Sequence, residues 1–236
     1  MPARNSIKYY LENGYYHIYN RGVEKRNIYQ DAQDYGVFLS YLKTYLNPKD
    51  RTSLEARLSS KETPTKEKDK ILKELRLNNF YGQIYLMAYC LMPNHFHILV
   101  KQEKKDGIDT FMNSLSTRYV IYFNRKYQRV GPLFQGVYKA VLVGNDEQLL
   151  HLSRYIHRNP LPTRPQAKAI SSLLKKSPQP SSYPDYIGIR RTSWLHPEEI
   201  LSFFPKTNPS PGYGEFVNQH ADPVTPPISN VIFEET

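Results

Sequence analysis

The strongest constraint on the fold of this chain is a pair of apolar segments joined by a short turn. Residues 79–90 are strongly apolar, and residues 94–101 form a second apolar run. Between them lies Met92-Pro93-Asn94, and proline and asparagine are residues that favour turns. The pattern predicts two strands connected at residues 92–94.

Four further segments extend this pair into an alternating order of strands and helices. The β-branched and aromatic run 15–23 and the run 134–143 predict two more strands. Apolar residues at helical spacing predict one helix from Asp31, its expected N-cap, to about residue 46, and a second from about 108 to 127. The order β-α-β-β-α-β predicts an α+β protein with a ferredoxin-like antiparallel sheet and helices on one face.

One more helix is expected after the last strand. Asn145 is the expected N-cap, and Gln148 occupies the position of a capping-box partner. Pro160 ends this helix, because the residue before a proline is pushed out of the helical region. We expect one domain over residues 8–160, which includes a charged insertion at 47–77 with a short helix near 66–77. A C-terminal extension at 161–205 and a Pro-rich, flexible tail at 206–236 are expected to follow.

Basic residues concentrate in the middle of the chain. The formal net charge is +10, and residues 101–191 hold 16 Lys and Arg against 6 Asp and Glu. Residues 192–236 hold 1 against 6, so the end of the chain is acidic. A concentrated positive surface favours a polyanionic partner such as nucleic acid. An ordinary solvated surface gives the same pattern, and charge alone does not choose between them.

Several classes of protein are disfavoured by what the sequence lacks. It has no run of about 18 apolar residues, so no membrane span is expected. The first residues lack the apolar core of a signal peptide, and secretion is not expected. The lone Cys90 excludes an intramolecular disulfide and a cysteine-based zinc site. These features favour a cytoplasmic protein.

Two histidines in the predicted strand 94–101 are candidate metal ligands. Side chains alternate across a sheet, so His95 and His97 share one face and Phe96 packs on the other. Two imidazoles on one face can bind a single metal ion. From the spacing alone, a solvated pair or one satisfied in the core is the commoner outcome.

Two polar residues on the last predicted helix are candidate partners of that pair. Tyr155 and Asn159 are four residues apart and so project from one face. A phenol beside a divalent cation ionises more easily and can act as a covalent nucleophile. An amide oxygen is a suitable ligand for magnesium or manganese. Tyr155 is also one of 20 tyrosines, and from this pattern alone a simple packing role in the core is the favoured interpretation.

These segments together carry a resemblance to a known family. The runs LMPNHFHILV, GPLFQGVYKAVLV and LLHLSRYIHRNP, with the opening YHIYNRGVEKRNIY, resemble the REP-associated tyrosine transposases. That group belongs to the single-tyrosine HUH transposases, where U is a bulky apolar residue. The similarity covers roughly residues 8–46 and 78–160, and SSYPDYIGIRRTSWLHPEEILSFF resembles a C-terminal element that many members carry. The charged insertion at 47–77 and the Pro-rich tail depart from the family pattern.

The resemblance implies an enzyme and assigns roles to its residues. His95 and His97 match the metal-binding histidines, Tyr155 matches the nucleophile, and Asn159 matches the amide that completes the metal site. The implied cofactor is a divalent metal, Mg²⁺ or Mn²⁺. The implied activity is cleavage and rejoining of single-stranded or hairpin DNA through a 5′-phosphotyrosine intermediate, by a transposase or domesticated transposase associated with the nucleoid.

Other polar residues receive weaker predictions. His151 is one turn before Tyr155, and helix packing is the expected role; His157 is expected at the surface or on DNA, and His17 is expected to be structural. Basic side chains of the central segment are expected to contact phosphates as a group, with aromatic residues stacking on unpaired bases. These basic residues are Arg118, Arg125, Lys126, Arg129, Lys139, Arg154 and Arg158.

Two other functions remain open from the sequence. A DNA-binding relic without catalysis would not need the His pair, Tyr155 and Asn159 together. A metal-dependent hydrolase using His95 and His97 would keep its activity after loss of Tyr155. No membrane partner is expected, and the sequence does not choose between a monomer and a homodimer.

Overall fold

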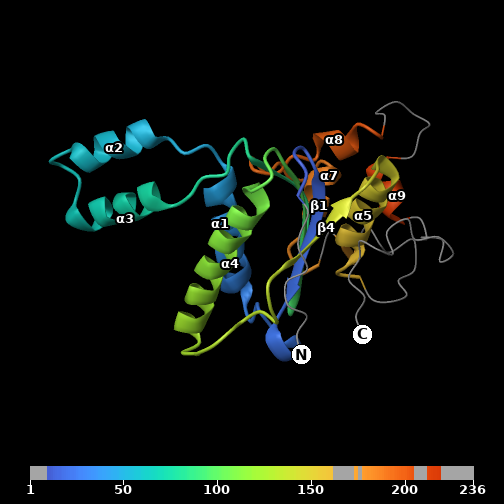
Figure 1. The fold of residues 1–236 in the computed structure, drawn as a ribbon, viewed down its shortest axis with the longest axis horizontal. Helices are drawn as coiled ribbons and strands as arrows, with labels where there is room; N and C mark the ends of the chain where they lie inside the picture. The colour runs from blue at the N-terminus through green and yellow to red at the C-terminus, as the bar shows by residue number, and fades with distance from the viewer. Residues whose placement is uncertain (1–9, 162–172, 175–176, 205–211, 219–236) are drawn as a thin grey trace.

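A four-stranded antiparallel sheet forms the centre of the molecule (Figure 1). The computed structural model describes residues 10–161, 173–174, 177–204 and 212–218. The order of the strands across the sheet is β2-β3-β1-β4. Their bounds are β1 Tyr15–Arg21, β2 Ile84–Met92, β3 His95–Gln102 and β4 Lys139–Val143.

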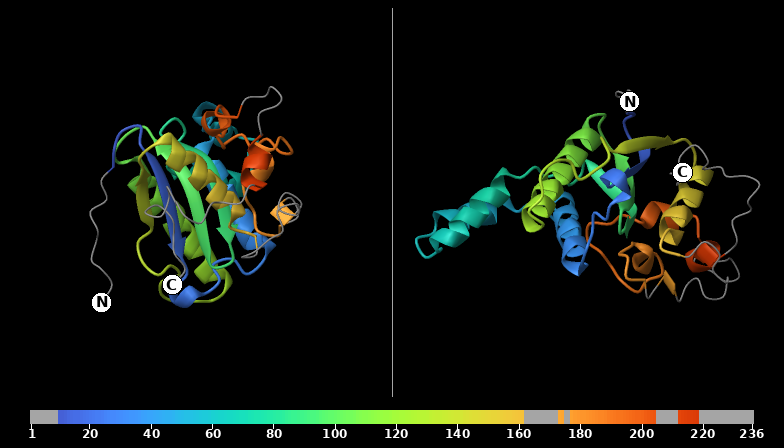
Figure 2. Two further views of the ribbon diagram at one scale, coloured as in Figure 1. Left: turned by 90° about the vertical axis from the view of Figure 1, so that its right-hand side faces the viewer. Right: turned by 90° about the horizontal axis from the view of Figure 1, so that it is seen from below.

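Two long helices cover one face of the sheet, and a third lies on the other face. The first two are α1, Ala32–Leu46, and α4, Gly107–Lys126, and the third is α5, Asp146–Arg158. Figures 1 and 2 show α1 and α4 on one side of the strands and α5 across the opposite side. The predicted ferredoxin-like α+β fold with an added C-terminal helix is therefore confirmed.

The predicted helix caps are present. Asp31 and Asp34 form a reciprocal capping box at the start of α1. Asn145 Oδ1 accepts from the backbone N–H of Gln148 at 2.8 Å, as expected for the N-cap of α5. Gln148 Oε1 accepts from the N–H of Gly144, one residue before the expected partner.

Burial on both faces of the central strands explains their apolar sequences. Tyr16 and Ile18 of β1 are buried, and Phe38 of α1 packs against Phe96 of β3 at 5.5 Å between ring centroids. In β2 and β3 nearly every residue is buried, because α1 and α4 lie on one side and α5 with the C-terminal elements on the other. The core therefore consists of two layers that share these strands.

Two strands begin later than the sequence predicted. β2 starts at Ile84 and not at residue 79, because residues 81–83 form a turn in which Gly82 has φ of +72°. β4 starts at Lys139 and not at residue 134. Phe134 makes only an isolated bridge with Gly22, and the chain bends between these points.

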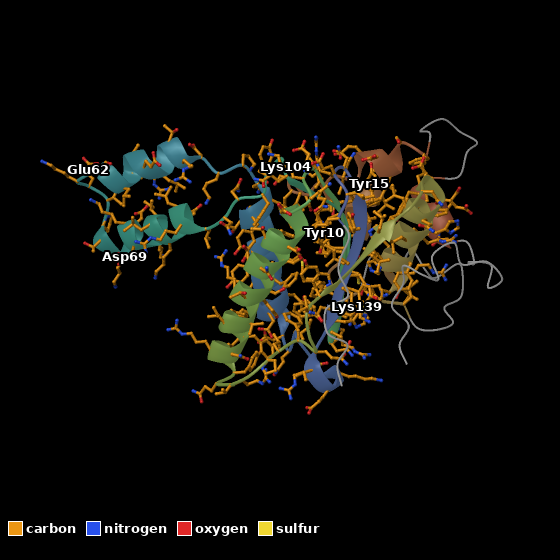
Figure 3. All side chains as sticks on the ribbon, viewed as in Figure 1. Tyr10, Tyr15, Glu62, Asp69, Lys104 and Lys139 are labelled. Carbon is orange, nitrogen blue, oxygen red and sulfur yellow. The ribbon has the colours of Figure 1, made fainter. Side chains whose placement is uncertain are left out.

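The charged insertion forms a pair of helices that projects from the rest of the molecule. These are α2, Arg51–Ser59, and α3, Thr65–Arg76, and Figures 1 and 2 show them extending away from the sheet. Glu62 and Asp69 lie near the far end of this arm (Figure 3). At its base, Asn79 Nδ2 donates to the carbonyl of Asn47 at 2.8 Å. The arm therefore leaves and re-enters the domain at one place.

Short helices of the C-terminal part pack on the α5 side of the sheet. They are α7, Tyr183–Tyr186, α8, Glu198–Leu201, and α9, Tyr213–Asn218; a 3-10 turn, η1, covers Val23–Lys25 after β1. Tyr213 and Val217 of α9 are buried. The expectation of a loose tail at 206–236 does not hold for these six residues; most of the tail lies outside the described residues. No helix in the described part of the chain is long and apolar enough to cross a membrane.

Candidate active site

The turn before β3 is held by the loop that follows β1. The backbone N–H of Gly22 donates to the carbonyl of Asn94 at 2.8 Å, and those of Ile28 and Tyr29 donate to the carbonyl of Pro93. A Cβ atom at Gly22 would lie 2.2 Å from the carbonyl oxygen of Arg26, so only glycine fits there. These contacts fix the point at which His95 enters the sheet.

His95 and His97 lie on the α5 face of β3, as predicted, and both are largely buried. Their side chains are 5% and 0% exposed. The two rings meet edge to face with centroids 4.9 Å apart. Burial, followed by the proximity of His17 and His95, holds the pKa of His97 well below its ordinary value, so this imidazole is neutral.

Helix α5 brings its two candidate residues to this pair. The ring of Tyr155 is 5.4 Å from that of His97, again edge to face. Oδ1 of Asn159 is 3.1 Å from Nε2 of His95, and Asn159 is the C-cap residue of α5. Both side chains are half-buried, and the four predicted residues form one site.

The donor set fits a divalent cation. Nδ1 of His95 is 2.6 Å from Oδ1 of Asn94, and its Nε2 faces Oδ1 of Asn159. Both oxygens only accept, whereas a neutral imidazole donates from one nitrogen. If the proton of His95 is on Nδ1, the lone pairs of His95 Nε2 and Asn159 Oδ1 therefore face each other at 3.1 Å. Adjacent octahedral ligands, each about 2.1 Å from Mg²⁺, are separated by about 3 Å.

The set is two imidazoles and an amide and contains no carboxylate. Within the described ranges, no group of three or more His, Cys, Asp or Glu side chains is arranged to hold a metal. An octahedral ion at such a site keeps open positions for water or substrate oxygens.

His17 belongs to the immediate surroundings of the site, which the sequence alone did not indicate. It is fully buried on β1, and its Nε2 is 2.9 Å from Nδ1 of His97. The sequence indicated only that His17 and Tyr19 lie on the same face of their strand. Its contact with His97 depends on the register of β1 against β3, in which Tyr19 lies opposite His97.

Arg21 is a second neighbour that the sequence analysis missed. It lies opposite His95 in the β1–β3 register, so both side chains are on the same face. Its guanidinium donates to Oε1 of Gln135 at 3.3 Å and 3.4 Å. The position of Arg21 beside the site depends on the β1–β3 register and on the fold of residues 133–138, and neither is evident from the sequence.

The histidines of α5 point away from the site. His157 is fully buried, with Nδ1 at 2.6 Å from the Tyr213 hydroxyl and Nε2 at 2.7 Å from that of Ser182. The prediction that it lies at the surface or contacts DNA is therefore wrong, because α7 and α9 cover that side of the helix. His151 contacts Arg154 and Phe216 and packs as expected.

The predicted phosphate contacts do not gather around the site. Arg118, Arg125 and Lys126 are on α4, on the opposite face of the sheet, and Arg129 follows it. Lys126 is paired with Asp31 and Asp34, and Arg118 stacks on Tyr41 at 3.9 Å. Arg129 donates to Asn124.

The three remaining basic residues lie on the α5 side. Arg154 stacks on Phe216 at 4.6 Å, and Arg158 donates to the carbonyl of Val217 at 3.1 Å, so both hold α9. Lys139 is exposed on the edge strand β4, with Nζ 5.8 Å from the centre of the Tyr19 ring (Figure 3). Of the seven, Lys139 is the one placed next to the site.

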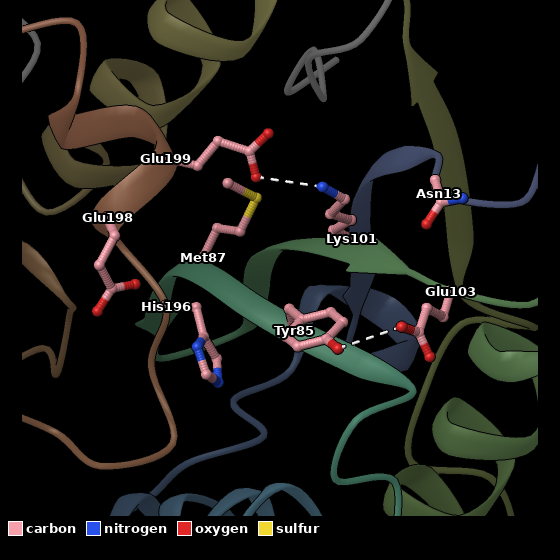
Figure 4. A pocket seen from close by; sticks show the side chains of 8 residues that line it. All are labelled: Asn13, Tyr85, Met87, Lys101, Glu103, His196, Glu198 and Glu199. Atoms are coloured by element: carbon pink, nitrogen blue, oxygen red, sulfur yellow. Dashed lines mark hydrogen bonds and ion pairs between the residues drawn. The ribbon is translucent and has the colours of Figure 1, made fainter.

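A separate hollow lies on the same sheet face at the other end of the strands. Its volume is about 330 Å³. Figure 4 shows Lys101 paired with Glu199 at 3.4 Å and Tyr85 bonded to Glu103 at 3.4 Å. The hollow contains none of the four predicted site residues.

Residues 61–159 match a family model described as transposase IS200 like. Over these residues, the chain is similar to the IS200-like transposases. The matched segment contains His95, His97, Tyr155 and Asn159, whereas β1 and α1 lie outside it. The family resemblance expected from the sequence is confirmed.

Two other comparisons were made. No curated protein matches the chain. One solved structure, of a REP-associated tyrosine transposase bound to a REP hairpin, matches with a TM-score of 0.46 and 11% identity, covering 81% of this chain and 96% of that chain. We draw nothing about function from so remote a likeness.

Proposed function

We propose that this protein is a transposase that cleaves and rejoins single-stranded DNA by covalent attack of Tyr155. The observation that carries the proposal is the convergence of two distant segments on one point. The Tyr155 ring is 5.4 Å from His97, and the Asn159 amide oxygen is 3.1 Å from His95. A tyrosine that served only to pack the core would not need this partner set.

His95, His97 and Asn159 are the residues that would hold a divalent metal, Mg²⁺ or Mn²⁺. When bound, such a metal withdraws charge from a phosphate oxygen and fixes the orientation of the phosphate. The neutral state of His97, which burial enforces through its lowered pKa, leaves the imidazole suited to ligation.

Tyr155 supplies the nucleophile in this scheme. Its phenolic oxygen forms a bond to phosphorus, and the bond from phosphorus to the 3′ oxygen breaks. The phenol loses its proton and the leaving oxygen gains one, so the products are a 5′-phosphotyrosine and a free 3′-OH. One phosphodiester replaces another, and an incoming 3′-OH can reverse the step without a nucleotide cofactor.

The substrate we propose is unpaired DNA beside a hairpin. Arg21 and Lys139 are basic side chains on the α5 face of the sheet, next to the site. They would contact the backbone at either side of the scissile phosphate. The hairpin rests on the family resemblance alone.

The test is incubation of the protein with hairpin-containing single-stranded DNA and Mn²⁺, followed by denaturing electrophoresis. Wild type should give a protein–DNA adduct and a 3′-OH product. Tyr155→Phe should give neither and should still bind DNA, because the substitution removes one oxygen and scarcely alters packing. Tyr19→Phe is the matched control, since Tyr19 is also within 6.0 Å of the His97 ring and should be dispensable.

The other outcomes separate the competing functions. Cleavage by Tyr155→Phe at the wild-type rate would indicate a hydrolase in which water attacks. DNA binding without cleavage by wild type under all metal conditions would indicate a DNA-binding relic.

A further inference from the structure

A buried imidazole lies directly behind one of the candidate metal ligands. His17 is 0% exposed on β1, with Leu99 and Val141 as its cross-strand neighbours. Its Nε2 is 2.9 Å from Nδ1 of His97, and the two rings stack with centroids 5.1 Å apart. The contact is a hydrogen bond between two ring nitrogens, so one must donate and the other accept.

The tautomer of His97 decides how this bond can be arranged. A neutral imidazole carries one proton, on Nδ1 or on Nε2. With that proton on Nδ1, His97 donates to His17 and keeps its Nε2 lone pair for a metal. With the proton on Nε2, His97 could only accept from His17 and would present an N–H where a ligand needs a lone pair.

We propose that His17 is a positioning residue, which accepts the Nδ1–H of His97 through its own Nε2 and so holds His97 in the tautomer that binds metal through Nε2. This inference rests on the proposed function for its metal. Histidine ligands are commonly oriented by a hydrogen bond from the second ring nitrogen to a carboxylate or carbonyl. Here a neutral imidazole has that role, and His17 carries its own proton on Nδ1.

The surroundings of His17 argue against a purely packing role. Between Leu99 and Val141, an apolar side chain would fill the same space without removing ring nitrogens from water. A buried polar group is tolerated where it is hydrogen-bonded, and the bond to His97 supplies this. The hydrogen bond is thus the property that distinguishes histidine from leucine at this position.

The first test is the tautomer of His97 in the metal-free wild-type protein. Long-range ¹H–¹⁵N correlation spectra of histidine-labelled protein distinguish a protonated Nδ1 from a protonated Nε2. We expect His97 to be protonated on Nδ1 and His17 to have a lone pair on Nε2. Protonation of His97 on Nε2 would overturn the inference, whatever the protein does to DNA.

The second test compares two substitutions at His17 by titration with Mn²⁺. His17→Leu removes the acceptor at similar volume and should weaken Mn²⁺ binding by roughly 10- to 100-fold, as for other partners of metal ligands. His17→Gln keeps an acceptor oxygen and should restore most of the affinity. Equal affinity of wild type and His17→Leu, with both shown to be folded by circular dichroism, would overturn the positioning role.

The two tests separate this inference from the function on which it rests. Absence of Mn²⁺ binding by the wild type would overturn the proposed metal site and, with it, the metal part of this inference. The tautomer measurement would then still decide the hydrogen bond. If His17→Leu does not fold, the inference is tested by the tautomer of His97 in the wild type and by the Mn²⁺ affinity of His17→Gln.

Discussion

Loss of either candidate histidine would remove a buried side chain. His97 is 0% exposed and bonded to His17, and His95 is 5% exposed and contacts Asn94 and the half-buried Asn159. Removal of either imidazole leaves a cavity, and removal of His97 also leaves His17 without its partner nitrogen.

We predict that His95→Ala and His97→Ala both abolish cleavage. Each should also lose roughly 1–3 kcal/mol of stability, because each breaks a hydrogen bond of a buried imidazole, to Asn94 or to His17. Asn159→Ala should weaken Mn²⁺ binding and leave residual cleavage. Urea unfolding and Mn²⁺ titration measure these effects, with His196→Ala, in the separate hollow, as the control. Full cleavage by a His95→Ala/His97→Ala double variant would refute the metal site.

Buried neutral histidines also make stability depend on pH. Burial, with a smaller contribution from Arg190, lowers the pKa of His157 to about 3, and burial lowers the pKa of His97 as well. The unfolded chain binds these protons near pH 6.5, so the stability is present above pH 6.5 and is lost as pH falls toward 3.

We predict a decline in the free energy of unfolding below pH 6.5, with a slope of at most about 1.4 kcal/mol per pH unit for each histidine. Denaturant unfolding between pH 4 and 7 measures it. His157→Gln should reduce the slope, because one buried titrating group is removed. An unchanged slope in this variant would show that His157 does not contribute.

The strand and helix periodicities predicted which residues meet, but not what surrounds them. The alternation His95-Phe96-His97 and the four-residue spacing from Tyr155 to Asn159 place all four on facing surfaces. The neighbours His17 and Arg21 required the register between β1 and β3, which no local pattern contains. His157 was wrongly placed for the same reason, since its partners are far along the chain.

At the scale of elements, helix α5 is held to the sheet by a chain of hydrogen bonds. The N–H of Tyr89 on β2 donates to Ser182 Oγ, which donates to Nε2 of His157. Nδ1 of His157 donates to the Tyr213 hydroxyl, which donates to Ser153 Oγ at 3.0 Å. The chain runs from β2 through the segment before α7 to α5 and α9, so part of the predicted tail positions α5.

We predict that Tyr213→Phe destabilises the protein by roughly 1–3 kcal/mol, because it leaves the buried Nδ1–H of His157 without an acceptor. Cleavage should fall as well, since α5 carries Tyr155 and Asn159. Thermal unfolding and the cleavage assay measure both. Glu215→Gln, on the exposed side of α9, is the control. Wild-type stability of Tyr213→Phe would show that α9 is dispensable for the position of α5.

The order of the main elements followed from the sequence, whereas its least periodic parts did not. The strands and helices of the sheet were predicted with small errors at their ends. The insertion was expected to hold one short helix near 66–77, and it holds α3 at Thr65–Arg76 and also α2. α2 was missed because Leu54 is its only buried residue, which leaves almost no apolar periodicity.

At the scale of the whole molecule, the positive charge is spread over both faces of the sheet. Arg125 lies on α4, on the face opposite Tyr155, and Lys139 lies on β4 beside Tyr19. The net charge of +10 predicts DNA affinity that falls steeply with salt. The position of each basic side chain, and not the net charge, decides which of them can contact a DNA strand at the candidate active site.

We predict that Lys139→Ala weakens binding of single-stranded DNA and lowers the slope of log affinity against log salt by about 0.7, the value for one lost phosphate contact. Arg125→Ala removes the same charge from the opposite face and should change the slope less. Fluorescence anisotropy with a labelled hairpin at several salt concentrations measures both. A larger effect of Arg125→Ala would move the DNA to the α4 face.

The most direct test of the central claim is the chemical identity of the covalent adduct. Wild-type protein is incubated with hairpin DNA and Mn²⁺, the DNA is digested to a short remnant, and the protein is analysed by peptide mass spectrometry. The account predicts a 5′-phosphonucleotide on the peptide that contains Tyr155, with fragmentation placing it on that phenol. A remnant on Tyr19, on another residue, or on none while cleavage proceeds would contradict the account.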